Sequence, residues 1–248
     1  MGHPGLRSPR EAGRLDGIAY HLWLPQDAGP VPALVVLHGA GSRKENHADF
    51  ARAAGDHGFA ALTFDNRGHG ETEGALGARA VSDIQKLVRM LAERDEIDER
   101  RIGVRGSSMG GLLALHAAAA SETVSGVIAI CPATEDMLLS DVRKVAAGQP
   151  PPPGSALESM RLDAPSLVAW LEEHDVRDAV ARIAGKPLML IHAAGDEVVP
   201  SAVSEELFER AGEPKRLLIT PDGDHRSAQH DAELQGESLR WLARAMRA

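Results

Sequence analysis

The sequence predicts an α/β fold, in which helices cover both faces of a mostly parallel β-sheet. The first indication is a series of short apolar runs without alternation, which are typical of strands buried on both faces. The second is that segments with helical spacing of apolar residues lie between several of these runs. Strand–helix alternation of this kind favours parallel strands joined by right-handed crossovers. The six runs span residues 33–38, 59–65, 102–106, 124–130, 188–192 and 217–220.

The remaining elements follow from the spacing of apolar side chains. Residues 18–24 alternate between apolar and polar positions, which predicts an antiparallel strand at the edge of the sheet. Apolar side chains recur three or four positions apart in several further segments. Helices are therefore expected over residues 81–91, over 112–120, after Pro200 and over 234–245.

A long segment separates the run that ends at Ile130 from the run that begins at Leu188, and it is longer than a crossover needs. Its last part, residues 170–183, predicts one helix. Its first part, residues 134–169, contains four consecutive prolines that favour an extended backbone. We interpret residues 134–169 as a short cap-like insertion that acts as a partial lid, with a plain surface loop as the alternative. The whole chain, residues 1–248, is predicted to form a single domain.

Composition excludes several classes of protein. With one cysteine among 248 residues, the chain can form no internal disulfide and has no cysteine cluster for a metal. The formal net charge of −9 argues against a nucleic-acid partner, which requires a basic face. Apolar runs are too short to cross a membrane, and the first ten residues lack the apolar middle of a secretory signal. We therefore expect a soluble, cytoplasmic protein.

The strongest motif is the sequence GSSMG at residues 106–110, a G-x-S-x-G match. It follows an apolar run and precedes a helical segment, which is the strand–turn–helix setting that a nucleophilic serine requires. Gly106 and Gly110 leave room for a very tight turn that exposes the Ser108 hydroxyl at a helix N-terminus. A plain loop with a helix cap, for which Ser107 is the candidate, is the alternative interpretation.

A nucleophilic serine needs a base, and His225 is the best candidate among eleven histidines. It lies on a loop after the run 217–220, whereas His230 is expected inside the last helix. An acid must orient the histidine, and Asp196 follows the run 188–192 across a short loop. Asp196 is preferred to its neighbour Glu197 because Gly195 makes the turn directly before it.

An oxyanion hole should complete the site. The sequence His38-Gly39-Ala40-Gly41 ends a buried strand with a glycine-rich turn, where backbone N–H groups can point into a cleft. The backbone N–H groups of Met109 and Ala40 are the expected donors, with Gly41 as a weaker candidate for the second. His38 and His192 also end strands, but their rings are expected to be buried and hydrogen-bonded.

Together these motifs resemble the α/β-hydrolase family over about residues 14–247. The resemblance implies a mostly parallel sheet of eight strands and a catalytic triad of Ser108, Asp196 and His225. It also implies that Asp65 and Arg67 shape a loop near the site without taking part in catalysis. The motifs occur in the family's order: HGAG at 38–41, DNRGHG at 65–70, GSSMG at 106–110, GD at 195–196 with VP at 199–200, and DH at 224–225.

Within the family, the chain is most similar to small serine esterases, dienelactone hydrolases and acyl-peptidase-like enzymes. The dienelactone hydrolases use a cysteine nucleophile and the dehalogenases an aspartate, whereas this chain has Ser108 at that place. The hypothesis is therefore hydrolysis of a small-molecule carboxylic ester through an acyl-enzyme, with no metal or organic cofactor. Thioesterase, acyltransferase, amidase or peptidase activity and a non-catalytic scaffold remain alternatives, and the oligomeric state is left open.

Overall fold

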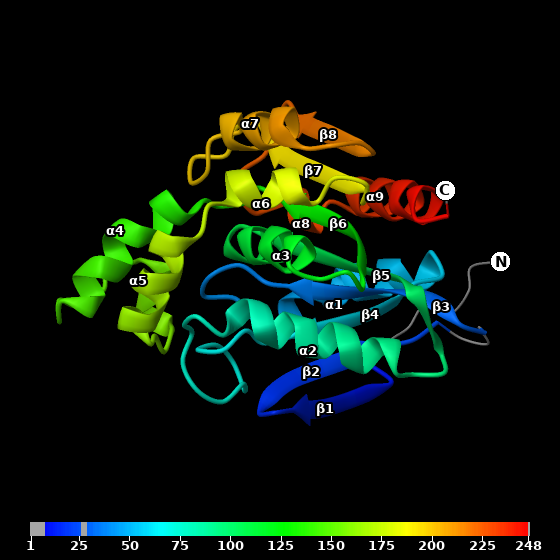
Figure 1. Ribbon diagram of the computed structural model, residues 1–248, viewed down its shortest axis with the longest axis horizontal. Helices are drawn as coiled ribbons and strands as arrows, with labels where there is room; N and C mark the ends of the chain where they lie inside the picture. Colours follow the sequence, from blue (N-terminus) through cyan, green and yellow to red (C-terminus); the bar gives the residue numbers. More distant parts are fainter. Residues whose placement is uncertain (1–7, 26–28, 248) are drawn as a thin grey trace.

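An eight-stranded sheet in the order β1-β2-β4-β3-β5-β6-β7-β8 forms the centre of the computed structural model (Figure 1). The structure describes residues 8–25 and 29–247. Strands β3 to β8 run parallel, and β2 is antiparallel to both of its neighbours. The predicted fold class is therefore confirmed. The strands are β1 (Glu11–Leu15), β2 (Ile18–Trp23), β3 (Val31–Leu37), β4 (Ala60–Phe64), β5 (Ile97–Ser107), β6 (Val124–Ile130), β7 (Leu188–Ala193) and β8 (Lys215–Thr220).

The predicted edge strand was wrong in one respect. Strand β2 is not at the edge, because β1 pairs with its free side in an antiparallel hairpin. The turn between them is Asp16-Gly17, and both residues have positive φ angles. Strand β1 is polar and half exposed, so it lacks the apolar pattern by which the other strands were found.

Helices cover the two faces of the sheet and form a separate apolar core on each (Figure 1). The larger core contains side chains of α2, α3 and α6, and the smaller contains side chains of α1 and α9. Apolar burial on both faces explains why β3, β4, β6 and β7 are almost wholly apolar. The helices outside the insertion are α1 (Ala48–Asp56), α2 (Ala80–Ala92), α3 (Met109–Ala119), α6 (Val176–Arg182), α7 (Ala202–Arg210), α8 (Ser227–His230) and α9 (Ala232–Ala245), with a 3₁₀ turn η1 (Lys44–His47) before α1.

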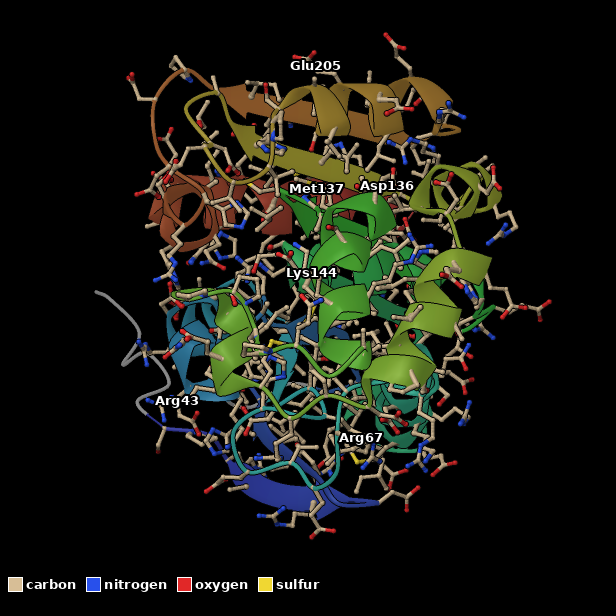
Figure 2. All side chains as sticks on the ribbon, turned by 90° about the vertical axis from the view of Figure 1, so that its left-hand side faces the viewer. Arg43, Arg67, Asp136, Met137, Lys144 and Glu205 are labelled. Atoms are coloured by element: carbon tan, nitrogen blue, oxygen red, sulfur yellow. The ribbon has the colours of Figure 1, made fainter. Side chains whose placement is uncertain are left out.

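The expected insertion forms a small helical cap over the carboxyl ends of the strands. It contains α4 (Glu135–Ala146), a 3₁₀ turn η2 (Ala156–Ser159) and α5 (Ala164–Glu173), and α4 packs against α5. Seen from this end, α4 crosses the middle of the face, with Asp136 and Met137 near one end and Lys144 further along (Figure 2). Two backbone hydrogen bonds of 2.9 Å join Leu76 to residues 161 and 163, so the cap is tied to the loop before α2.

The single helix predicted over residues 170–183 is two helices. Helix α5 ends at Glu173, and α6 begins at Val176 after the Asp175 side chain accepts a hydrogen bond from the Arg177 N–H. The cap therefore extends to the end of α5, four residues past the predicted boundary of 169. No helix in the described part of the chain is long and apolar enough to cross a membrane. Residues 1–7, on which the argument about a secretory signal partly rested, lie outside the described residues.

Candidate active site

The Ser108 turn joins the last residue of β5 to the first residue of α3. Ser108 has φ 53° and ψ −122°, a strained conformation for a residue with a side chain. A Cβ atom at Gly106 would collide with the backbone of Gly110, and one at Gly110 would lie 2.6 Å from the His38 carbonyl oxygen. Both glycines are therefore required sterically, as the motif predicted.

Neighbouring strands hold the turn in place. The Ser108 N–H donates to the Ile130 carbonyl at 2.9 Å, and the Ala133 N–H donates to the Ser108 carbonyl at 3.1 Å. Ser108 therefore lies beside the segment that follows β6. Ser107 is the last residue of β5 and does not cap α3, because its hydroxyl donates to the Gln229 side chain at 2.6 Å.

Asp196 and His225, predicted from different loops, form a hydrogen-bonded pair. The His225 Nδ1 lies 2.7 Å from the Asp196 Oδ2. The other carboxylate oxygen accepts the N–H groups of Val198 at 2.9 Å and Val199 at 2.8 Å. Burial would raise the pKa of Asp196, but these hydrogen bonds outweigh it and lower the pKa below its usual value. The carboxylate is thus held ionised and aimed at the imidazole.

Cys131, the single cysteine of the chain, is buried beside this acid–imidazole pair. It follows β6 with a positive φ of 43°, and its sulfur lies within 4.8 Å of ligand atoms of Asp196 and His225. Burial raises the pKa of the Cys131 thiol to about 12, so it is a neutral thiol beside the carboxylate. These three groups are of types that bind metals, but a hydrogen-bonded acid–imidazole pair already accounts for their proximity.

Two buried histidines shape the loop predicted to form the oxyanion hole. The Nε2 of His38 accepts the Asn66 N–H at 3.0 Å, and the Nε2 of His69 accepts the Gly41 N–H at 3.1 Å. Burial lowers the pKa of both rings, to about 4 for His38, which keeps these nitrogens able to accept. The Gly41 N–H is therefore already engaged, so Ala40 is left as the expected donor beside Met109.

Asp65 and Arg67 make the contacts of a structural loop. The Asp65 carboxylate accepts hydrogen bonds from the Lys44 N–H, the Lys44 ammonium and the Glu71 N–H, all between 2.8 and 2.9 Å. Arg67 pairs with Asp83 of α2 at 2.6 Å. These contacts agree with the non-catalytic roles that the resemblance implied.

Three further histidines have partners in the fold, and one of them, His192, lies against Asp196. His192 is buried as expected, with its ring bonded to Ser204 and to the Val199 carbonyl, and it lies 3.3 Å from the Asp196 Oδ2. His230 is not in the last helix but ends α8, where it binds Asp49 at 2.8 Å. His116 is buried and pairs with Glu135 at the start of the cap.

An apolar cavity lies between the cap and helices α2 and α3, and the space within it and at its opening to solvent amounts to about 450 Å³. Every side chain that lines it is apolar, and the cap contributes Leu138, Met160 and Trp170. Ala40 and Met109 line the same cavity. The cavity therefore begins where the two expected oxyanion donors lie.

Comparison with known proteins agrees with this architecture. A family model described as serine aminopeptidase, S33 (Hydrolase_4) matches residues 28–172. The uncharacterized protein YfhR of Escherichia coli O157:H7 is 27% identical over 87% of this chain and 72% of its own length. The 2,6-dihydropseudooxynicotine hydrolase of Paenarthrobacter nicotinovorans is 30% identical over 90% of this chain and 61% of its own length.

A solved structure shows the same fold. The α/β hydrolase GrgF from Penicillium sp. sh18 superposes with a TM-score of 0.76 and 23% identity, covering 96% of this chain and 98% of that one. The parallel sheet, the strained serine turn and the family match lead to one conclusion: the chain belongs to the α/β-hydrolase family, in the group described as S33 serine aminopeptidases.

Proposed function

We propose that this protein is a serine hydrolase that cleaves carboxylic esters through an acyl-enzyme. The observation that carries the proposal is the 2.7 Å hydrogen bond between His225 and Asp196, at the edge of the sheet where Ser108 occupies a strained turn. A carboxylate-oriented imidazole is the base that a serine hydroxyl needs to become nucleophilic. Membership of a hydrolase family supports the same reaction class.

The proposed reaction has two halves. Ser108 Oγ attacks the ester carbonyl carbon while the His225 Nε2 takes its proton, and the backbone N–H groups of Ala40 and Met109 stabilise the oxyanion. The imidazolium then gives that proton to the alcohol oxygen as the C–O bond breaks. In the second half, His225 removes a proton from water, which attacks the acyl carbon. The bond to Ser108 Oγ then breaks, the imidazolium returns its proton to this oxygen, and the carboxylic acid leaves. Asp196 holds the imidazole orientation and stabilises its cation throughout.

The same residues would serve a thioesterase, an acyltransferase or an amidase, since these differ in the bond broken or in the acceptor. Ester hydrolysis is the proposal because the cavity next to the expected oxyanion donors is lined by apolar side chains, which suit the uncharged body of an ester. The proposed substrate is a small molecule, and the proposed location of the protein is the cytoplasm.

A fluorophosphonate probe tests the nucleophile directly. The wild-type protein should gain one covalent adduct by intact mass spectrometry, and Ser108→Ala should gain none. Ser125→Ala is the matched control, because it removes a strand serine bonded to the Ile102 carbonyl. Labelling that persists in Ser108→Ala, or folded wild-type protein that does not label, would contradict the proposal.

A further inference from the structure

We infer that the apolar cavity is the acyl subsite, so that the preferred ester carries an uncharged, apolar acyl group and releases its alcohol on the β7–β8 side. The inference rests on the proposed function and names the substrate class for it. Its basis is the position of the cavity relative to the residues that must handle the two parts of the ester.

The two parts of an ester leave the carbonyl carbon in different directions. The alcohol oxygen must face His225, because this residue is the proposed proton donor to the leaving group. His225 follows β8, and its partner Asp196 follows β7. The leaving alcohol therefore occupies the side of Ser108 on which β7 and β8 lie.

The cavity is on the other side of the nucleophile. Its walls come from the loop after β3, from α2 and the residues before it, from α3 and from the cap. A carbonyl oxygen held by the Ala40 and Met109 N–H groups would place its carbon at the mouth of this cavity. With the alcohol directed toward β7 and β8, the acyl chain is the part that enters it.

The lining determines which acyl groups can enter. Among the described residues, every cavity wall is apolar, so a buried ammonium would find no carboxylate partner there. The acidic residues of the cap, among them Asp136 and Glu172, line a separate polar groove on the outside of α4 and α5. An aminopeptidase must bind the α-ammonium group of its substrate, and this apolar subsite does not suit such a group. The cavity therefore does not fit the aminopeptidase activity named in the description of the matching family.

A series of p-nitrophenyl esters from acetate to octanoate tests the acyl subsite. Burial of each additional methylene should raise kcat/KM about fourfold until the cavity is filled. A parallel series of acetate esters with lengthening alcohols should show a much weaker dependence on length. Aminoacyl p-nitroanilides should not be hydrolysed.

Two adjacent leucines of α4 provide matched variants. Leu138 lines the cavity, whereas Leu139 lines the outer groove. Leu138→Phe should lower the octanoate-to-acetate ratio of kcat/KM at least tenfold, and Leu139→Phe should leave that ratio unchanged. Ser108-dependent turnover with a flat acyl series, or with a steep alcohol series, would overturn the acyl subsite and leave the proposed function intact. Absence of both labelling and turnover would overturn both.

A separate observation concerns the other face of the sheet. Arg105 of β5 is fully buried, and within the described part of the chain no carboxylate lies at ion-pair distance from it. Burial lowers the pKa of Arg105 to about 10. Its guanidinium packs 4.1 Å from the centre of the Phe50 ring and donates to the Gln229 carbonyl at 2.8 Å. The guanidinium also lies 3.2 Å from the His47 Nδ1, and among the described residues its Nε atom has no hydrogen-bond partner. A buried cation with only neutral partners is costly, which calls for a reason specific to this position.

The geometry points to Gln229 as a positioning residue that joins the histidine loop to the serine turn. Gln229 lies four residues after His225, in α8. Its carbonyl accepts from Arg105, and its side-chain oxygen accepts the Ser107 hydroxyl at 2.6 Å. The loop that carries the base is thereby bonded twice to the strand that carries the nucleophile.

Gln229→Met and Ser107→Ala test the side-chain hydrogen bond between these two residues, since both substitutions keep the contact of the Gln229 carbonyl with Arg105. Each should speed amide hydrogen exchange in residues 221–230 by about five- to tenfold, the effect of one net hydrogen bond. Each should lower kcat by a similar factor, with KM changed less than twofold. The double variant should be no worse than either single variant, because both remove the same bond.

Ser125→Ala, which removes a hydrogen bond at the opposite end of the strands, should change none of these quantities. Unchanged exchange and unchanged kcat in Gln229→Met, or strictly additive effects in the double variant, would overturn the positioning role. The exchange measurement needs no substrate, so it tests the positioning role of Gln229 even if the proposed function is wrong.

Discussion

The substitution Asp196→Asn is predicted to disable the enzyme without unfolding it. In the wild type, the Oδ1 atom accepts two backbone N–H groups at 2.8 and 2.9 Å, while the Oδ2 atom faces the His225 Nδ1 at 2.7 Å. An asparagine amide keeps its oxygen toward the two backbone donors, so its NH₂ group must face the imidazole. The ring then accepts at Nδ1 and carries its proton on Nε2, the nitrogen that should take the proton from Ser108.

The wrong tautomer should lower kcat by about 10⁴-fold, the size of effect seen when the acid of a serine triad becomes an amide. That factor corresponds to about 5.5 kcal/mol of lost transition-state stabilisation. The assay is kcat and KM on p-nitrophenyl butyrate, with circular dichroism melting to verify folding. Glu197→Gln is the matched control, because it neutralises the next residue and should retain full activity. A loss of less than tenfold in folded Asp196→Asn protein would refute this reasoning.

Three further predictions address the fold around the site. Gly106→Ala should abolish fluorophosphonate labelling and lower the melting temperature, because its methyl group collides with the start of α3, whereas Gly29→Ala meets nothing within 4 Å and should change neither. Lys44→Met should lower the free energy of unfolding by about 3–5 kcal/mol in urea titrations, since it leaves the buried Asp65 carboxylate without its cation. A loss below about 1 kcal/mol would contradict a stabilising role for this buried ion pair. Burial lowers the pKa of His38 from 6.5 to about 4, so the unfolded chain takes up a proton at this ring before the folded protein does as the pH drops. The free energy of unfolding should therefore fall between pH 6.5 and pH 4, by about 3 kcal/mol from this ring. Urea midpoints that are equal at pH 7 and pH 4.5 would contradict this prediction.

The sequence predicted most of the sheet because most of its parallel strands are buried on both faces, although the edge strand β8 is only partly buried. Strand β6 has the predicted bounds, and β7 differs from the prediction by one residue. Strand β1 was missed because its residues, Glu11–Leu15, lie at an exposed edge and carry no apolar pattern. The break between α5 and α6 had a signal in Asp175, a helix N-cap residue, but the apolar spacing continues through it.

The site was predictable where it depends on the order of motifs along the chain. Asp196 follows the buried strand β7 and His225 follows the partly exposed edge strand β8, and adjacent parallel strands bring their carboxyl ends to one edge of the sheet. Contacts that depend on tertiary register were not predictable, because nothing near Cys131 or Gln229 in the sequence indicates their partners. The engagement of the Gly41 N–H by His69, 28 residues away, belongs to the same class.

The central claim is that an ester transfers its acyl group to the Ser108 oxygen. Rapid-quench mass spectrometry after mixing the protein with p-nitrophenyl octanoate tests this claim most directly. The predicted result is a transient octanoyl mass on the peptide that contains Ser108, formed with the burst of nitrophenol and absent from the Ser108→Ala protein. Turnover with no acyl adduct at any time, or an adduct on a different peptide, would contradict the account.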